Sequence, residues 1–109
     1  MKSKYVERAR RVAQMAWRLV KNFSFSMSEA MKSAWAMVKM RDRMNFDVVE
    51  FVYNKVNGEE RVARGTLSHE IVPQTKGERS APKDCFVYYD NDKEGWRSFK
   101  INNFVRVSA

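Results

Sequence analysis

The hydrophobic and polar positions of this chain follow two different periods, and the change falls near residue 45. Before that point, apolar residues recur at steps of three and four, as they do on one face of a helix. After it, apolar and polar residues alternate, as they do on the two faces of a strand. We therefore expect helices first and a β-sheet module after them.

Two helices joined by a short turn are predicted in the first part of the chain. The first covers residues 5–21, and its apolar stripe consists of Tyr5, Ala9, Val12, Ala13, Ala16, Leu19 and Val20. The second covers about 27–42 and begins after Ser26, because Ser26 and Glu29 have the spacing of a capping box. Its apolar stripe consists of Met27, Ala30, Met31, Ala34, Trp35 and Val38. The two stripes are expected to face each other as an αα-hairpin.

Three methionines of the second helix, Met37, Met40 and Met44, fall outside its predicted stripe. We expect them to contact either the β-sheet module or a second subunit. Met27, Met31 and Trp35 lie on the stripe and are assigned to core packing rather than to an adaptable binding surface.

Five short strands are predicted after residue 45, over 48–53, 60–67, 85–89, 96–100 and 104–107. Asn57-Gly58 indicates a hairpin with a type I′ turn, which needs positive φ at both residues. Gly65 is expected to mark a bulge or a sharp bend. Residues 68–84 form a long loop, and Asn102-Asn103 a tight turn. The fold class predicted is α+β, with a helical hairpin over 1–44 and a five-stranded antiparallel SH3-like or Sm-like barrel over 45–109; an OB-fold is the alternative.

The net charge of the chain is +8, and all of it lies in the helical part. Residues 1–44 carry eleven Lys and Arg against three Asp and Glu, whereas residues 45–109 carry ten of each sign. A cationic helical pair indicates a polyanionic partner, most commonly DNA or RNA. The predicted contact residues are Arg8, Arg11, Arg18, Lys32, Lys39, Arg41 and Arg43. The alternative is a solvated basic surface that only keeps the protein soluble.

A second possible contact surface is predicted on the barrel. It consists of Arg61, Arg64, Tyr88, Tyr89, Trp96 and Arg97. Small barrels bind single strands by stacking bases on aromatic side chains beside a basic groove. Strand alternation predicts that one of Tyr88 and Tyr89 points inward and the other outward. In the alternative, the aromatics form the core and the arginines pair across strands with Glu50, Glu59 and Glu60.

No convincing catalytic site, metal site or cofactor motif is found. Cys85 and His69 are the one nucleophile–base option, and no sequence feature brings them together. Asp90, Asp92 and Glu94 lack the pattern of an EF-hand loop. No apolar run approaches the ~20 residues of a membrane span. The expected protein is not an enzyme, has no membrane partner and is cytoplasmic, in a bacterial host cell if it is phage-encoded.

Several short motifs of the second part resemble a known family. They are Phe51–Gly58, Arg61–Leu67 with its Gly65-Thr66-Leu67 run, Val87–Asp90, Trp96–Lys100 and Asn103-Phe104. In this order and spacing, over residues about 46–107, the chain resembles the small WYL-related family of phage and bacterial proteins with an Sm-like SH3 β-barrel fold. The resemblance implies that fold and a phage or mobile-element setting. It carries over no common activity.

The leading functional hypothesis is a non-enzymatic phage or mobile-element protein that binds nucleic acid mainly through phosphate contacts of its basic helices. One alternative is a protein-interaction module that inhibits or modulates a host factor. Another is a sensor of a small ligand or nucleotide that uses the barrel. Association into a homo-oligomer is left open.

Overall fold

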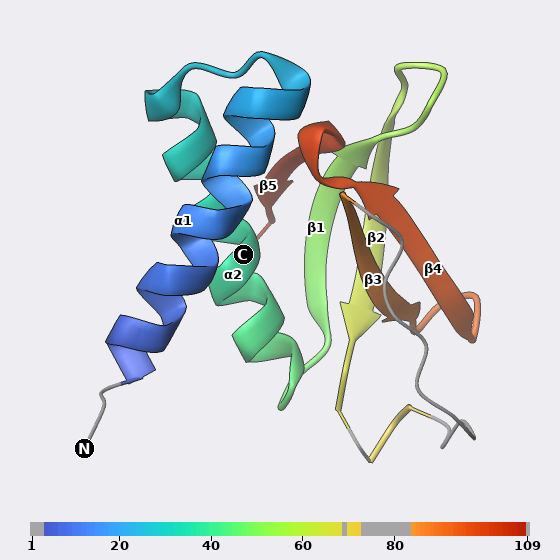
Figure 1. The fold of residues 1–109 in the computed structure, drawn as a ribbon. Coiled ribbons are helices and arrows are strands. Elements are labelled where there is room, and N and C mark those ends of the chain that lie inside the picture. Colours follow the sequence, from blue (N-terminus) through green and yellow to red (C-terminus); the bar gives the residue numbers. More distant parts are fainter. Residues whose placement is uncertain (1–3, 69, 73–83, 109) are drawn as a thin grey trace.

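The structure is a helical hairpin packed against a five-stranded antiparallel sheet (Figure 1). It is a computed structural model that describes residues 4–68, 70–72 and 84–108. The helices are α1 (Lys4–Phe23) and α2 (Met27–Met44), and a short 3₁₀ helix, η1, covers Ile101–Asn103. The strands are β1 (Val49–Asn54), β2 (Glu60–Thr66), β3 (Cys85–Asp90), β4 (Gly95–Lys100) and β5 (Phe104–Val107). The α+β class and the helix-then-sheet order predicted from the sequence are confirmed.

The turn between the two helices is defined by local hydrogen bonds. Helix α1 ends before Ser24, whose φ of 59° lies in the left-handed region. Ser26 then caps α2, since its hydroxyl accepts a hydrogen bond from the Glu29 N–H at 3.1 Å. The Glu29 carboxylate accepts one in return from the Ser26 N–H at 3.4 Å. The predicted capping box is confirmed. Helix α1 begins one residue earlier and ends two residues later than predicted, and α2 begins as predicted and ends two residues later.

The buried face of α2 is rotated relative to the predicted stripe. Ala30, Ala34 and Val38 are buried, as expected. Met37, Met40 and Met44 are buried too and belong to the core cluster shared with the sheet. Met27 is 52% exposed, so its assignment to the core is wrong. The reason is that α2 contacts β1 and β5 as well as α1, and its buried face turns toward the sheet.

The sheet has the strand order β4-β3-β2-β1-β5, so the last strand returns to pair with the first. All pairs are antiparallel, and the β1–β2 register runs without interruption from Val49↔Gly65 to Asn54↔Glu60. An irregularity lies in the β1–β5 pairing between Val52 and Tyr53. This arrangement agrees with the predicted small barrel.

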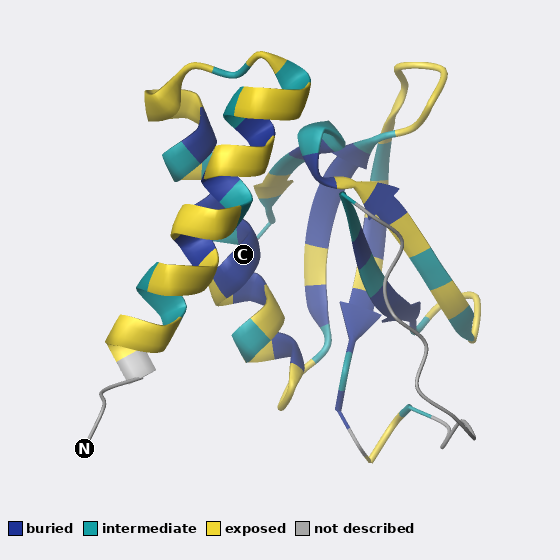
Figure 2. Ribbon diagram, viewed as in Figure 1, coloured by how far each residue is buried: buried dark blue, intermediate teal, exposed yellow. Residues whose placement is uncertain are grey.

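Aromatic side chains fill the inside of the barrel. Phe99 stacks on Tyr53 and on Phe86, with ring centres 4.9 Å and 5.2 Å apart. Phe51 meets the edge of Tyr88 at 5.0 Å. The Tyr88 and Tyr53 hydroxyls are hydrogen-bonded at 3.3 Å. Figure 2 shows the buried positions of the strands and the helices turned toward one another.

The β1–β2 hairpin differs from the predicted turn type. Gly58 has a φ of +91°, but Asn57 does not have the positive φ that a type I′ turn requires. Instead, the Gly58 N–H donates to the Lys55 carbonyl at 2.9 Å, and the Lys55 N–H donates to the Glu59 carbonyl at 2.8 Å. This is the pattern of a type I turn followed by a left-handed glycine.

Gly65 marks a close approach of side chains rather than a bulge. A Cβ at this position would lie 2.6 Å from Cδ2 of Tyr88 and 3.2 Å from Cε1 of Phe51. The register with β1 is regular up to its last pair, Val49↔Gly65, and Gly65 also pairs with Asp90 of β3. The missing side chain therefore allows the ring of Tyr88 to pack against the backbone of β2.

A single cluster of buried side chains joins the hairpin and the sheet. It includes Val12 and Leu19 of α1, Met37 of α2, and Phe51 and Phe86 of the barrel. The division into 1–44 and 45–109 stays a prediction, but in the described residues both parts contribute to one core.

Candidate nucleic-acid interface

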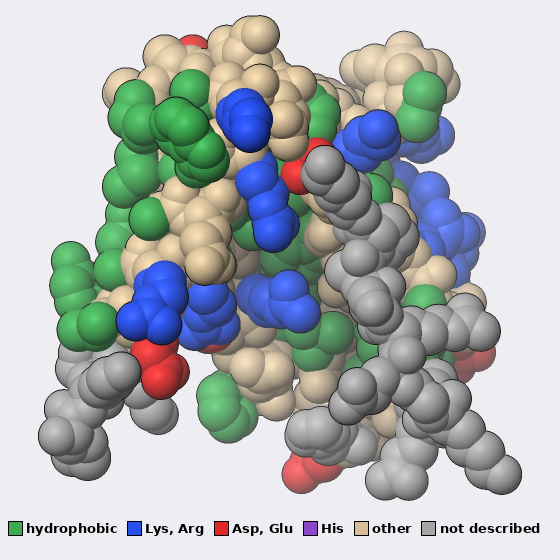
Figure 3. Space-filling view, viewed as in Figure 1, with side chains coloured by type: hydrophobic (Ala, Val, Ile, Leu, Met, Phe, Trp, Pro, Cys, Tyr) green, Lys and Arg blue, Asp and Glu red, His purple; other side chains and the backbone are tan. Residues whose placement is uncertain are grey.

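Three of the four arginines of α1, namely Arg8, Arg11 and Arg18, lie on the side of the helix that faces its junction with α2 and the sheet. Arg11 and Arg18 are seven residues apart, which places them on the same side two turns from each other. Figure 3 shows Lys and Arg side chains gathered in the middle of this view, over α1 and its junction with the sheet. The predicted cations of α1 therefore contribute to one shared face.

Arg11, Arg18 and Arg41 line a hollow of about 190 Å³, which we call the α1–β3 hollow. Its walls include Met37, from α2, and Phe86, from β3. The Arg41 guanidinium lies 5.9 Å from the centre of the Phe86 ring, a cation–π distance that helps to position its charge. Residues far apart in the sequence thus place three cations around one depression.

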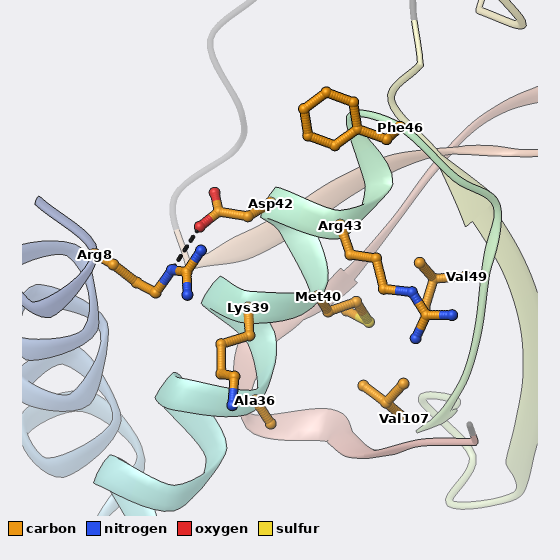
Figure 4. Close-up of a pocket in the computed structure, with 9 residues that line it drawn as sticks. All are labelled: Arg8, Ala36, Lys39, Met40, Asp42, Arg43, Phe46, Val49 and Val107. Carbon is orange, nitrogen blue, oxygen red and sulfur yellow. Dashed lines mark hydrogen bonds and ion pairs between the residues drawn. The ribbon is translucent and has the colours of Figure 1, made fainter. Parts of the chain in front are cut away.

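A second, larger hollow of about 570 Å³ lies between α2 and the strands β1 and β5; we call it the α2–β5 hollow (Figure 4). Arg8, Lys39 and Arg43 supply its cations, and Phe46 lies at one end. Ala36, Met40, Val49 and Val107 supply apolar side chains. Lys32, the seventh predicted cation, is exposed two turns before Lys39 on the same side of α2.

Asp42 lies between the two hollows and pairs with a cation from each. One of its carboxylate oxygens accepts from Arg8 Nε at 2.8 Å, and the other accepts from Arg11 Nη1 at 3.3 Å. These side chains keep 24–48% of their surface exposed, so the pairs are partly hydrated. Asp42 therefore positions two arginines and also lowers the positive charge between the hollows.

The second predicted surface is not a single surface. Tyr88 is fully buried in the barrel, which corrects its assignment as a contact residue. Tyr89 is also buried, since Trp96 covers it edge-on at 5.7 Å, which corrects its assignment as a contact residue. Trp96 is 44% exposed, but it lies next to Arg97 on a strand, so the two point to opposite faces.

Two of the predicted barrel arginines pair with acids at the end of β3 and in the β3–β4 turn, while Glu60, one of the predicted glutamate partners, pairs with Arg106 at 3.9 Å. Arg97 lies 3.6 Å from Asp90, and Arg64 lies 3.8 Å from Asp92. Arg61 is half-buried in β2. These local pairs reduce the positive charge that the barrel offers to a ligand.

The other sequence candidates do not form a reactive site among the described residues. His69 lies outside them, and Cys85 is a half-buried free thiol of β3. Asp90 accepts hydrogen bonds from the N–H groups of Asp92 and Lys93, both at 3.0 Å, and so caps a turn. In the described parts of the chain, no three His, Cys, Asp or Glu side chains could hold a metal ion. Neither described helix is both long and apolar enough to cross a membrane.

Sequence reasoning missed two residues of this interface, Asp42 and Phe46. The sequence shows Asp42 as one of the three acids of the helical part, but it does not show that Asp42 lies between Arg8 and Arg11. Phe46 follows α2 directly and fits neither the helical nor the alternating pattern. An aromatic residue outside both patterns is the signal that could have identified it.

Comparison with known proteins places most of this structure in one family. No curated protein and no solved structure matches the chain. A family model described as WYL_2, Sm-like SH3 beta-barrel fold, matches residues 37–105. The match begins within α2, so it includes Met37 and the residues that anchor this helix to the sheet. It covers more than half of the sequence, and the chain therefore belongs to the WYL_2 family with an Sm-like SH3 β-barrel fold.

Proposed function

We propose that this protein binds nucleic acid without catalysing a reaction, mainly through contacts from α1 and α2 to phosphates. The observation that carries the proposal is the place of the predicted cations at two hollows. These lie on different sides of α2, because Lys39 and Arg41 are two residues and so roughly 200° apart around the helix. Six of the seven line two neighbouring hollows, namely Arg8, Lys39 and Arg43 in one and Arg11, Arg18 and Arg41 in the other. A surface that served only solubility would not need cations gathered at depressions. The cytoplasmic location and the phage or mobile-element setting stay predictions.

The charge distribution supports a phosphate ligand. The helical part holds the whole net charge of +8, while the barrel part is neutral. Arginine guanidinium groups match phosphate geometry through paired N–H donors. Each phosphate that such a group neutralises releases condensed counterions, so the affinity should fall steeply with salt.

The direct experiment measures binding of labelled DNA and RNA by fluorescence anisotropy at about 50 and 200 mM salt, a range over which phosphate-dominated binding changes strongly. The test variant combines Arg11→Gln, Arg18→Gln and Lys39→Gln. We expect it to bind at least tenfold more weakly at the lower salt concentration. Its plot of log affinity against log salt should become shallower by about 0.9 for each phosphate contact removed from duplex DNA.

A matched control removes the same charge from the barrel part with Lys55→Gln, Lys93→Gln and Lys100→Gln, all exposed. This variant should keep most of the affinity. No detectable binding of the wild type at the lower salt concentration would overturn the proposal. An equal loss in both triple variants would show that only net charge matters and would remove the basis for the two hollows.

A second candidate function is a protein-interaction module, and one observation favours it. Val6, Ala13 and Trp17 are exposed along a single side of α1, with Trp17 58% accessible. Figure 3 shows apolar side chains along the flank of the hairpin that faces away from the sheet. Exposed apolar patches of this kind mark contact sites for other proteins. A partner captured after nuclease treatment by the wild type but not by Trp17→Ser would favour this candidate.

A further inference from the structure

We infer that the α2–β5 hollow binds an unpaired nucleotide of a single strand, with its base stacked on Phe46 and its phosphates held by Lys39, Arg43 and Arg8. The inference rests on the proposed function and names the form of nucleic acid that the surface takes. Duplex DNA or RNA would then be the weaker ligand.

The first observation is the position of Phe46. Its side chain is 83% exposed, although it belongs to the hydrophobic residues that normally avoid water. It lies at one end of the hollow, and the charged ends of Lys39 and Arg43 lie farther along the hollow (Figure 4). An exposed aromatic ring in a groove that also carries positive charges is the arrangement by which proteins stack single-stranded bases.

The second observation is that the backbone under Phe46 is held in place. The N–H groups of Phe46 and Asp47 both donate to the Arg43 carbonyl, at 3.1 Å and 3.0 Å. The buried hydroxyl of Thr66 lies 3.0 Å from the Asp47 carbonyl and 3.1 Å from the Met44 carbonyl. The exposed ring is therefore presented from a fixed turn. A ligand that stacks on it needs little ordering of the backbone, which reduces the entropic cost of binding.

The third observation is the composition of the hollow. Ala36, Met40, Val49 and Val107 give it apolar walls, and cations lie among them. Its volume of about 570 Å³ is in the range of ligand sites. The faces of a base are apolar and its backbone is anionic, so one nucleotide matches both parts of the lining. In a duplex the bases are stacked on each other, and only the phosphates could reach this site.

The cations lie at intervals along the path that a single strand of nucleic acid would take across the hollow. Lys39 and Arg43 are one helical turn apart, roughly 6 Å along the axis of α2. Arg8 reaches the same hollow from α1, where Asp42 positions its guanidinium at 2.8 Å. A single strand of nucleic acid that crosses the end of α2 can therefore place successive phosphates near these cations while one base stacks on Phe46.

The experiment compares labelled oligothymidylate and oligouridylate of about 12 nucleotides, a length within single-strand site sizes, with a duplex of equal length at one salt concentration. For the single strands, Phe46→Ala should weaken binding roughly tenfold, the scale of one base–aromatic stack. Phe46→Trp should restore binding. Neither variant should change duplex binding or the salt dependence, because no charge is altered.

The matched control is Val56→Ala, at a fully exposed apolar residue in the β1–β2 hairpin, away from the hollow. It should leave binding of all three ligands unchanged. Since Phe46 is largely exposed, its replacement should not unfold the protein, and thermal unfolding of each variant checks this.

The outcomes separate this inference from the proposed function. Equal affinity for single strands and duplex, with no effect of Phe46→Ala, overturns the inference and leaves the proposed function standing. No binding of any oligonucleotide overturns both. A polyglutamate peptide that binds as tightly as oligothymidylate and is weakened equally by Phe46→Ala also overturns the inference, because the hollow would then be a site for acidic peptides.

Discussion

At the scale of single residues, Gly65, Thr66 and Leu67 fix the junction between the sheet and α2. Gly65 leaves room for the ring of Tyr88. The buried Thr66 hydroxyl bonds to backbone groups at the end of α2, and the Leu67 N–H donates to the Met44 carbonyl at 2.9 Å. One of the runs that carry the family resemblance thus builds the scaffold under Phe46, which accounts for these three residues without assigning them a chemical role.

The close approach at Gly65 predicts the effect of adding one methyl group. Gly65→Ala would place a Cβ against the packed rings of Tyr88 and Phe51 and should lower the free energy of unfolding by about 1–3 kcal/mol. Urea denaturation measures this change. Gly95→Ala is the matched control, since its Cβ would meet nothing closer than 3.9 Å. Equal stability of the two variants would contradict the close packing.

The buried tyrosine pair predicts a loss of stability at alkaline pH. Burial, and then the hydrogen bond with Tyr53, raise the pKa of Tyr88 well above its ordinary value of 10.0. The folded state therefore keeps the Tyr88 proton at a pH where the unfolded state releases it. This contribution to stability is complete below pH 10 and decreases above it.

Tyr88→Phe tests that effect, because it removes the titrating hydroxyl and keeps the ring. The variant should be less stable than the wild type by about 1 kcal/mol at neutral pH, where a buried hydrogen bond is lost. The difference should shrink as the pH rises above 10, as measured by urea midpoints. A constant difference across this range would contradict the assignment.

At the scale of elements, α2 has three roles: it packs on α1, it packs on the sheet, and it presents cations at the α2–β5 hollow.

The start of α2 depends on the capping box. Ser26→Ala should lower stability by about 1 kcal/mol, because the N–H of Glu29 loses its acceptor. Thermal unfolding measures the effect, and Ser28→Ala, within the same first turn, should be nearly neutral. A smaller loss for Ser26→Ala than for Ser28→Ala would contradict the capping role.

Elements with one buried side could be predicted from the sequence, and elements with two could not. The apolar stripe of α1 identified Val12, Ala16 and Leu19, which are buried, but it also included Tyr5 and Ala13, which are exposed, so these two assignments are wrong. In α2 the stripe pointed to Met27, which is exposed, because the pattern contains no information that the sheet covers a second side. Similarly, alternation located the strands but not the burial of Tyr89, which depends on Trp96 from the next strand.

At the scale of the whole molecule, positive charge is separated from the barrel. The ion pairs of the barrel join barrel residues to one another and its charges balance, while Asp42 lies among the helical cations. All seven cations could be named from the sequence because charge is visible there. The grouping of six of them at two hollows, and the place of Phe46, could not be predicted, because each hollow combines residues from separate elements.

The position of Asp42 predicts that its removal strengthens nucleic-acid binding. Asp42→Asn releases Arg8 and Arg11 and raises the net charge from +8 to +9, because one of the thirteen acidic residues is lost. Affinity at low salt should rise severalfold, and the salt dependence should become steeper, as measured by fluorescence anisotropy. Glu59→Gln changes the charge equally in the β1–β2 hairpin and should have a smaller effect. An unchanged or weaker affinity for Asp42→Asn would mean that the carboxylate is needed to orient the arginines.

The single core that unites the hairpin with the barrel constrains how related chains can diverge. Met44 lines neither hollow, yet it is buried in the core cluster that joins α2 to the strands beneath it. When such a methionine changes size during evolution, we expect a compensating change in a strand residue opposite. Correlated substitutions between α2 and β1 or β5 should therefore accompany any inherited shift in the width of the α2–β5 hollow.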